Sequence, residues 1–191
     1  MEETTTFLIV NIVGGILVLG SYLVYISQFP QESSQLWGGV SKKIQRLIVP
    51  FMFLAAGGYL LTGWWFWQTI DPKFLGFAGN LGYTGIITLF GIFLGFSTAW
   101  IPTAIKAIQT RSTRWKITTY GVLIVVSISC LIILFLICTA TVETSKSPIG
   151  KNLAIIGWCF LCFQTVILDG LFWVIKFQPD KAYLVEIKIK T

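Results

Sequence analysis

Residues 81–109 read LGYTGIITLFGIFLGFSTAWIPTAIKAIQ, and this stretch decides the fold. A helix crosses a bilayer with about 20 apolar residues, so the stretch is long enough to span one. Its small and polar residues recur at alternating steps of four and three positions, which keeps them on one side of a helix. They are Thr84, Thr88, Gly91, Gly95, Thr98 and Pro102. The pattern predicts the central helix of a membrane bundle.

Five of these residues predict how that helix packs. We define the small-residue stripe as Thr84, Thr88, Gly91, Gly95 and Thr98. Lipid supplies little hydrophobic drive between helices, so they associate where small residues let two backbones approach closely. Gly91 and Gly95 form a G-x-x-x-G pair in the middle of the stripe. We therefore expect the stripe to be a helix-packing surface that faces other helices.

The composition of the whole chain is that of a membrane protein. Of its 191 residues, 55% are hydrophobic and 12% are charged, whereas an average soluble domain has about 25% charged residues. Apolar segments of spanning length recur along the chain, at residues 7–27, 47–68, 81–105, 117–140 and 153–176. We predict an all-α, polytopic integral membrane helix bundle with five transmembrane helices, in which residues 1–191 form a single transmembrane domain.

The distribution of Lys and Arg predicts the orientation of the bundle. Grouped by alternate sides of the membrane, eleven Lys and Arg residues fall on one side and three on the other. The positive-inside rule then places the N-terminus outside and the C-terminus inside. Basic residues at membrane edges suit anionic headgroups, so we expect the lipid bilayer, and no nucleic acid, as a partner of these charges.

The fourth apolar segment and the two ends of the chain also allow structural predictions. Residues 122–137 contain no glycine, so we expect the fourth segment at the lipid-facing edge of the bundle. The acidic residues 1–6 argue against a cleaved signal peptide, so we expect the first segment to be retained. Residues 183–190 alternate like a strand without a partner, and we expect an interfacial or disordered tail.

The cysteines and tryptophans also have a plain interpretation. Cys159 and Cys162 form a C-x-x-C, but the chain contains no His to join them at a metal, and all four cysteines lie in predicted spans. We expect packing thiols, no metal and no cofactor. Trp64, Trp65 and Trp67 suit the membrane interface. The alternative is a cluster that stacks on a quinone or a carotenoid.

One acidic residue lies inside a predicted span, Asp169. Helical periodicity places Asp169 and Thr165 on one stripe of the fifth segment and Gln164 on a neighbouring stripe. Asn11, in the first segment, could form a hydrogen bond across helices. Asp169, Thr165, Gln164 and Asn11 are therefore the candidate intramembrane polar site.

A carboxylate inside a bilayer is costly, by up to about 3 kcal/mol on insertion scales, unless it is paired or protonated. We expect Asp169 to face the bundle in a structural role, bonded to a neighbouring hydroxyl or to a cation at the same depth. The candidate cations are Lys43, Arg46, Lys106 and Lys176. The alternative is a role in binding or transport.

The chain is poorly equipped for catalysis. It contains no His, no intramembrane pair of acids and no phosphate-binding glycine motif, so we do not expect an enzyme. We favour a non-catalytic multi-pass membrane protein that acts through helix–helix association, as an accessory subunit of a larger membrane assembly or as a homo-oligomer. The alternative is a small channel or carrier whose polar path includes Asp169. A path through the bilayer needs polar groups at several depths, and the spans offer few.

Overall fold

The computed structural model describes residues 2–69, 82–140 and 148–177. Within these ranges 93% of the residues are helical and no strand is present. The elements are α1 (Glu2–Gln28), α2 (Pro30–Gln35), α3 (Lys42–Thr69), α5 (Gly82–Thr110), α6 (Thr113–Thr139), α7 (Pro148–Cys162), the π-helix η2 (Phe163–Trp173) and α8 (Val174–Lys176). The strand-like residues 183–190 lie outside the described ranges.

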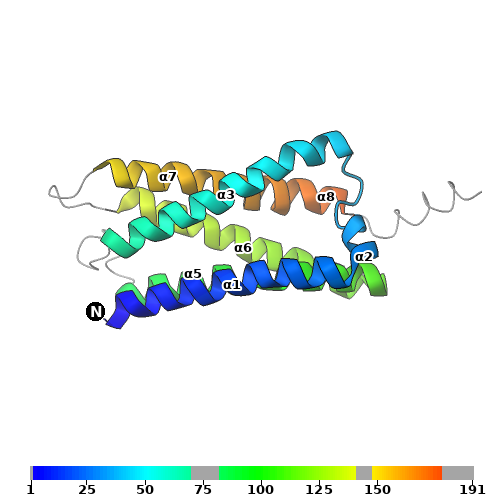
Figure 1. The fold of residues 1–191 in the computed structure, drawn as a ribbon, viewed down its shortest axis with the longest axis horizontal. Helices are drawn as coiled ribbons and strands as arrows, with labels where there is room; N and C mark the ends of the chain where they lie inside the picture. Colours follow the sequence, from blue (N-terminus) through cyan, green and yellow to red (C-terminus); the bar gives the residue numbers. More distant parts are fainter. Residues whose placement is uncertain (1, 70–81, 141–147, 178–191) are drawn as a thin grey trace, which may run out of the picture.

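The long helices form one elongated up-and-down bundle (Figure 1). Five helices in the described ranges are long and apolar enough to cross a membrane, the last being formed by α7, η2 and α8 together. The prediction of an all-helical bundle is therefore confirmed, while its orientation in a membrane stays a prediction. The helices extend beyond the predicted spans because they continue into polar ends. For example, α3 begins at Lys42 and includes Lys43 and Arg46.

The helices pack in a definite order. α5 lies along α1 on one side and α6 on the other, α6 also contacts α7 and η2, and α3 packs along α7. The short helix α2 lies at one end of the bundle, with the first turns of α3 and α6 and the last turns of α1 and α5 (Figure 1). We call this end the α2 end, and the opposite end, which holds the start of α1, the N-terminal end.

The expectation that the fourth segment lies at the lipid-facing edge is wrong. In α6, 44% of the most apolar window is buried, whereas in α1 the corresponding share is 11%. Its buried side chains recur at steps of three and four, and two of them, Ser129 and Cys130, are small. These small side chains lie on the buried face of α6, which is the most buried of the five candidate spans.

The small-residue stripe is not the buried face of α5 in the described chain. Thr84, Thr88 and Gly95 are exposed, Gly91 and Thr98 are half-buried, and no described atom lies within 4 Å of a Cβ built on Gly95. The large side chains Ile86, Phe90, Phe93, Leu94 and Ile101 form the buried face instead. The physical reason is that bulky aromatic residues fill the bundle interior, while the Thr88 and Thr98 hydroxyls bond to carbonyl groups of their own helix.

Close backbone approach occurs instead between α3 and α7. A Cβ built on Gly157 would lie 2.9 Å from Cα and 3.0 Å from O of Gly58, which is closer than ordinary van der Waals contact. The hydroxyl of Thr62 donates to the carbonyl oxygen of Ala154 at 3.0 Å, one turn away on both helices. The two helices therefore meet at a glycine pair that no side chain could enter without separating them.

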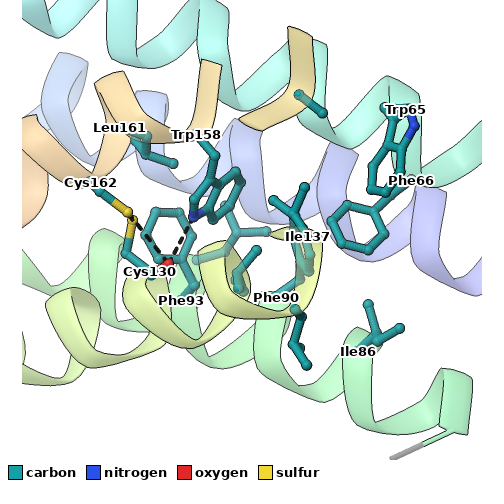
Figure 2. Close-up of a cluster of buried hydrophobic side chains, with 14 of the residues drawn as sticks. Trp65, Phe66, Ile86, Phe90, Phe93, Cys130, Ile137, Trp158, Leu161 and Cys162 are labelled. Carbon is teal, nitrogen blue, oxygen red and sulfur yellow. Dashed lines mark hydrogen bonds between the residues drawn. The ribbon is translucent and has the colours of Figure 1, made fainter. Parts of the chain in front are cut away.

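An aromatic core fills the bundle towards the N-terminal end (Figure 2). Phe90 contacts Phe7 and Phe66 with ring centroids 5.1 and 5.4 Å apart, and Trp158 lies 5.6 Å from Phe90. Trp158 is fully buried, and its Nε1 donates to the carbonyl oxygen of Cys130 at 2.8 Å. This core leaves little room for polar groups between the helices.

The cysteines do not behave as a C-x-x-C pair. All four are free thiols, and Cys159 is exposed whereas Cys162 is buried. Cys162 lies beside Cys130 of α6, with their Sγ atoms 3.1 Å apart (Figure 2). The thiol of Cys162 is thus part of the contact between α6 and α7.

Candidate binding site

A cavity of about 200 Å³ lies between the helices near the α2 end. Its walls come from α1, α2, α3, α5 and η2, together with the connection that follows α2. Asp169 and Gln164 are among the lining residues, and the other described lining residues are aromatic or apolar apart from Ser33. The cavity therefore combines an acidic group with mostly apolar walls.

The π-helix brings the two polar residues of this cavity together. An α-helix turns by about 100° per residue, so residues five apart point roughly 140° away from each other. A π-helix closes i→i+5 hydrogen bonds instead, which aligns residues five apart. Gln164 and Asp169 are spaced in this way within η2, and Nε2 of Gln164 donates to Oδ1 of Asp169 at 2.9 Å. Helical periodicity had placed them on different stripes.

The connection after α2 closes the cavity at the α2 end. Gly38 has φ = 50°, a left-handed conformation that favours glycine, and a Cβ there would lie 2.6 Å from the carbonyl oxygen of Lys176. The N–H of Gly39 donates to the same oxygen at 3.2 Å. Nε1 of Trp173 donates to the carbonyl oxygen of Leu36 at 2.7 Å. These contacts hold the connection against the end of the last span.

Asp169 has no cationic partner in the described part of the chain. The expected ion pairs with Lys43, Arg46, Lys106 or Lys176 are absent among the described residues, and the hydrogen-bond donor to Asp169 is the Gln164 amide. The inward-facing position is as expected, because Asp169 lines the cavity. The donor is thus neither of the expected partners, a cation or a neighbouring hydroxyl, because those Lys and Arg side chains lie at polar helix ends and the π-helix supplies the Gln164 amide instead.

Two buried polar atoms of the cavity walls lack a partner among the described residues. They are Oε1 of Gln164 and Nε1 of Trp100. The Gln164 side chain is 6% exposed, so water does not readily satisfy its oxygen. A buried polar group without a hydrogen bond costs about 1–3 kcal/mol. Unpaired atoms in a cavity wall are the kind of group that a bound ligand satisfies.

Thr165 and Asn11 do not belong to this cavity. The hydroxyl of Thr165 donates to the carbonyl oxygen of Leu161 at 2.9 Å, and its own carbonyl oxygen accepts from Ser127 of α6 at 3.1 Å. Nδ2 of Asn11 donates to the carbonyl oxygen of Phe7 at 2.7 Å, and its Oδ1 accepts from the Tyr59 hydroxyl at 2.5 Å. Thr165 thus anchors η2, and Asn11 joins α1 to α3.

The acidic end of the cavity is lined by aromatic side chains. These side chains were not among the site residues predicted from the sequence. The Trp100 ring lies 5.6 Å from Tyr22 and 5.6 Å from Trp173, and all three line the cavity. Trp173 could have been found, because it follows Asp169 by four positions on the same helical stripe. Tyr22 and Trp100 lie on other helices, and no local pattern links them to Asp169.

A scan against protein-family models and searches of curated proteins and of solved structures found no match to this chain. No group of three or more His, Cys, Asp or Glu side chains within residues 2–69, 82–140 and 148–177 could hold a metal ion. The cavity at Asp169 is therefore the feature from which a function can be inferred.

Proposed function

We propose that the chain is a non-catalytic multi-pass membrane protein that binds a small ligand in the Asp169 cavity. The observation that carries this proposal is the carboxylate of Asp169 beside the unpaired amide oxygen of Gln164, in a cavity lined by four of the candidate membrane spans. Ionisable groups inside membrane spans are rare and generally serve a function or a specific pair. The π-helix supports the same proposal, because such segments occur frequently at functional sites.

Binding fits this geometry better than conduction. A conducting path needs polar groups at several depths of the bilayer. Between the cavity and the N-terminal end, the interior is filled by the aromatic core around Phe90 and Trp158. Asn11, one of the polar residues considered for such a path, is already bonded to Tyr59. A carrier role would require this core to rearrange around a bound solute.

A catalytic role has no support in the cavity walls. A nucleophile needs a base within hydrogen-bond reach. The lining residues include the hydroxyl of Ser33, which donates to the carbonyl oxygen of Phe29 at 2.7 Å and thus to its own helix segment. Asp169 forms no hydrogen bond with a nucleophilic side chain among the described residues, so we propose that the cavity binds a ligand and does not catalyse a reaction.

The test is a binding panel on the purified chain in nanodiscs. Small cationic, neutral and anionic compounds are screened by thermal shift against the wild type and Met52→Trp, since Met52 lines the cavity and a larger ring there should fill it. Leu60→Trp is the matched control, because Leu60 lies on the same helix and is 69% exposed. We expect compounds that stabilise the wild type and Leu60→Trp but not Met52→Trp. A panel without any such compound would refute the proposed function.

A second function is favoured by a separate observation, the exposed position of Thr84, Thr88 and Gly95 on α5. We propose that this surface contacts another membrane helix, either in a homo-oligomer or in a larger assembly to which the chain is an accessory subunit. Small residues allow the close approach that such contacts need. Gly95→Leu should reduce chemical cross-linking between chains or to partner subunits in native membranes. Gly63→Leu, at another glycine with open space around it, is the control.

A further inference from the structure

We propose that the ligand of the Asp169 cavity is a small organic cation, an alkylammonium group that carries a short apolar body with a hydroxyl or ether oxygen. This inference rests on the proposed function and specifies its ligand class. It follows from the charge, the unpaired atoms, the aromatic walls and the size of the cavity.

The acidic character of the cavity favours a cationic ligand. Among the described residues that line the cavity, Asp169 is the one charged residue, and none is Lys or Arg. The Gln164 amide that donates to Asp169 is neutral, so it supplies no positive charge to balance an ionised carboxylate. Buried charges in proteins are normally paired. A cation bound in the cavity would supply that pair.

The unpaired atoms of the walls refine the chemistry. Oε1 of Gln164 is a second acceptor beside the carboxylate of Asp169, and it has no described donor. An ammonium N–H, or the polarised methyl groups of a quaternary ammonium, would approach both acceptors. Nε1 of Trp100 is an unpaired donor. A hydroxyl or ether oxygen on the ligand would accept a hydrogen bond from this N–H.

The aromatic walls suit the same charge. Tyr22, Trp100 and Trp173 form a contiguous group of rings with neighbouring centroids 5.6 Å apart. Trp37 and Phe172 also line the cavity. Aromatic faces attract cations through their quadrupoles, and aromatic cages recognise quaternary ammonium groups. An anion would meet the carboxylate and the negative ring faces, and a neutral hydrocarbon would leave the polar atoms unpaired.

Nearby charges and the cavity size limit the ligand further. Nζ of Lys176 lies 6.0 Å from the centroid of the Phe172 ring, but the Lys176 side chain is exposed and does not line the cavity. A volume of about 200 Å³ is below the roughly 300–1,000 Å³ typical of pockets for drug-sized molecules. The apolar body is therefore short.

The test compares choline with 3,3-dimethylbutan-1-ol, its uncharged isostere, on the wild-type chain. Isothermal titration is done in phosphatidylglycerol nanodiscs, whose headgroups contain no ammonium group. We expect choline to bind at least about tenfold more tightly than the isostere, since charge and ring contacts act only on the cation. This comparison needs no variant. Equal affinities for the two compounds would overturn the inference.

Variants assign the selectivity to named residues. Asp169→Asn keeps the side-chain volume and should lower choline affinity by about tenfold or more while leaving the isostere unchanged. Glu32→Gln removes a negative charge from α2 without touching the cavity walls, and it should leave choline affinity unchanged. An Asp169→Asn chain that binds choline as well as the wild type would overturn the inference.

Two sources can present this chemistry, a free alkylammonium compound and the headgroup of phosphatidylcholine. Short-chain phosphatidylcholine added to the choline titration distinguishes them, because a headgroup that enters the cavity displaces choline. Displacement of choline would identify the lipid headgroup as the ligand, and a lack of displacement would identify the free alkylammonium compound. If neutral or anionic compounds of the panel bind and choline does not, the ligand class is wrong and the proposed binding function stands. If no compound of any charge binds, the proposed function itself fails.

Discussion

The contact of Gly58 with Gly157 predicts a large loss of stability from a small substitution. A Cβ added at Gly157 would lie 2.9 Å from Cα and 3.0 Å from O of Gly58, whereas ordinary contacts are 3.4–4 Å. Because the neighbouring atoms are backbone, α3 and α7 must move apart, and the Thr62 bond to Ala154 lengthens with them. Overpacking of this kind costs about 1–3 kcal/mol. We expect Gly157→Ala to lower the free energy of unfolding by that amount relative to Gly63→Ala, a glycine-to-alanine change in an open part of α3.

The assay is equilibrium unfolding in mixed micelles, followed by circular dichroism. The matched control is Gly63→Ala, because no described atom lies within 4 Å of a Cβ at Gly63 and the change also improves helix propensity. We expect the control to be neutral or stabilising by up to about 1 kcal/mol. Equal effects of the two substitutions would show that α3 and α7 do not meet at this glycine pair.

Three further outcomes are expected. Tyr59→Phe removes the hydrogen bond to Asn11 and should lower the free energy of unfolding by about 0.6 kcal/mol, the average for such bonds in membranes. Choline binding should be unchanged, and a loss of binding would place Asn11 in the site. Oxidation with copper phenanthroline should form a disulfide between Cys130 and Cys162, whose Sγ atoms are 3.1 Å apart. Peptide mass spectrometry identifies the linked residues, and a link between Cys159 and Cys130 would contradict the α6–α7 packing. In a cysteine-free chain, Glu3→Cys should react with an impermeant maleimide that is added outside the cell, whereas Ser34→Cys should react only after the membrane is permeabilised. Labelling of both positions from one side would disprove the predicted orientation.

The existence and number of the long helices could be predicted from the sequence, because hydropathy is a local property of each segment. Which side of each helix is buried could not. The small-residue stripe of α5 resembles a packing surface, yet Phe90 and Phe93 occupy the interior of the described bundle. The glycine pair that does meet, Gly58 and Gly157, joins segments far apart in the chain. Such a pairing depends on the tertiary arrangement, which periodicity along one segment does not contain.

The candidate site was predicted in part. Asp169 and Gln164 stood out as polar residues in an apolar span, and both line the cavity. Their hydrogen bond could not be predicted, because a period of 3.6 residues per turn separates positions that a π-helix aligns. Tyr22 and Trp100 come from α1 and α5, and only the packing of those helices brings them to Asp169.

The most direct test of the binding site is the stoichiometry with which the wild-type chain binds the tightest compound of the panel, measured by isothermal titration in nanodiscs. We expect one site per chain, lost in Met52→Trp and retained in Leu60→Trp, because Met52 lines the cavity and Leu60 is exposed on the same helix. Undiminished binding by Met52→Trp would contradict the assignment of the ligand to the cavity at Asp169.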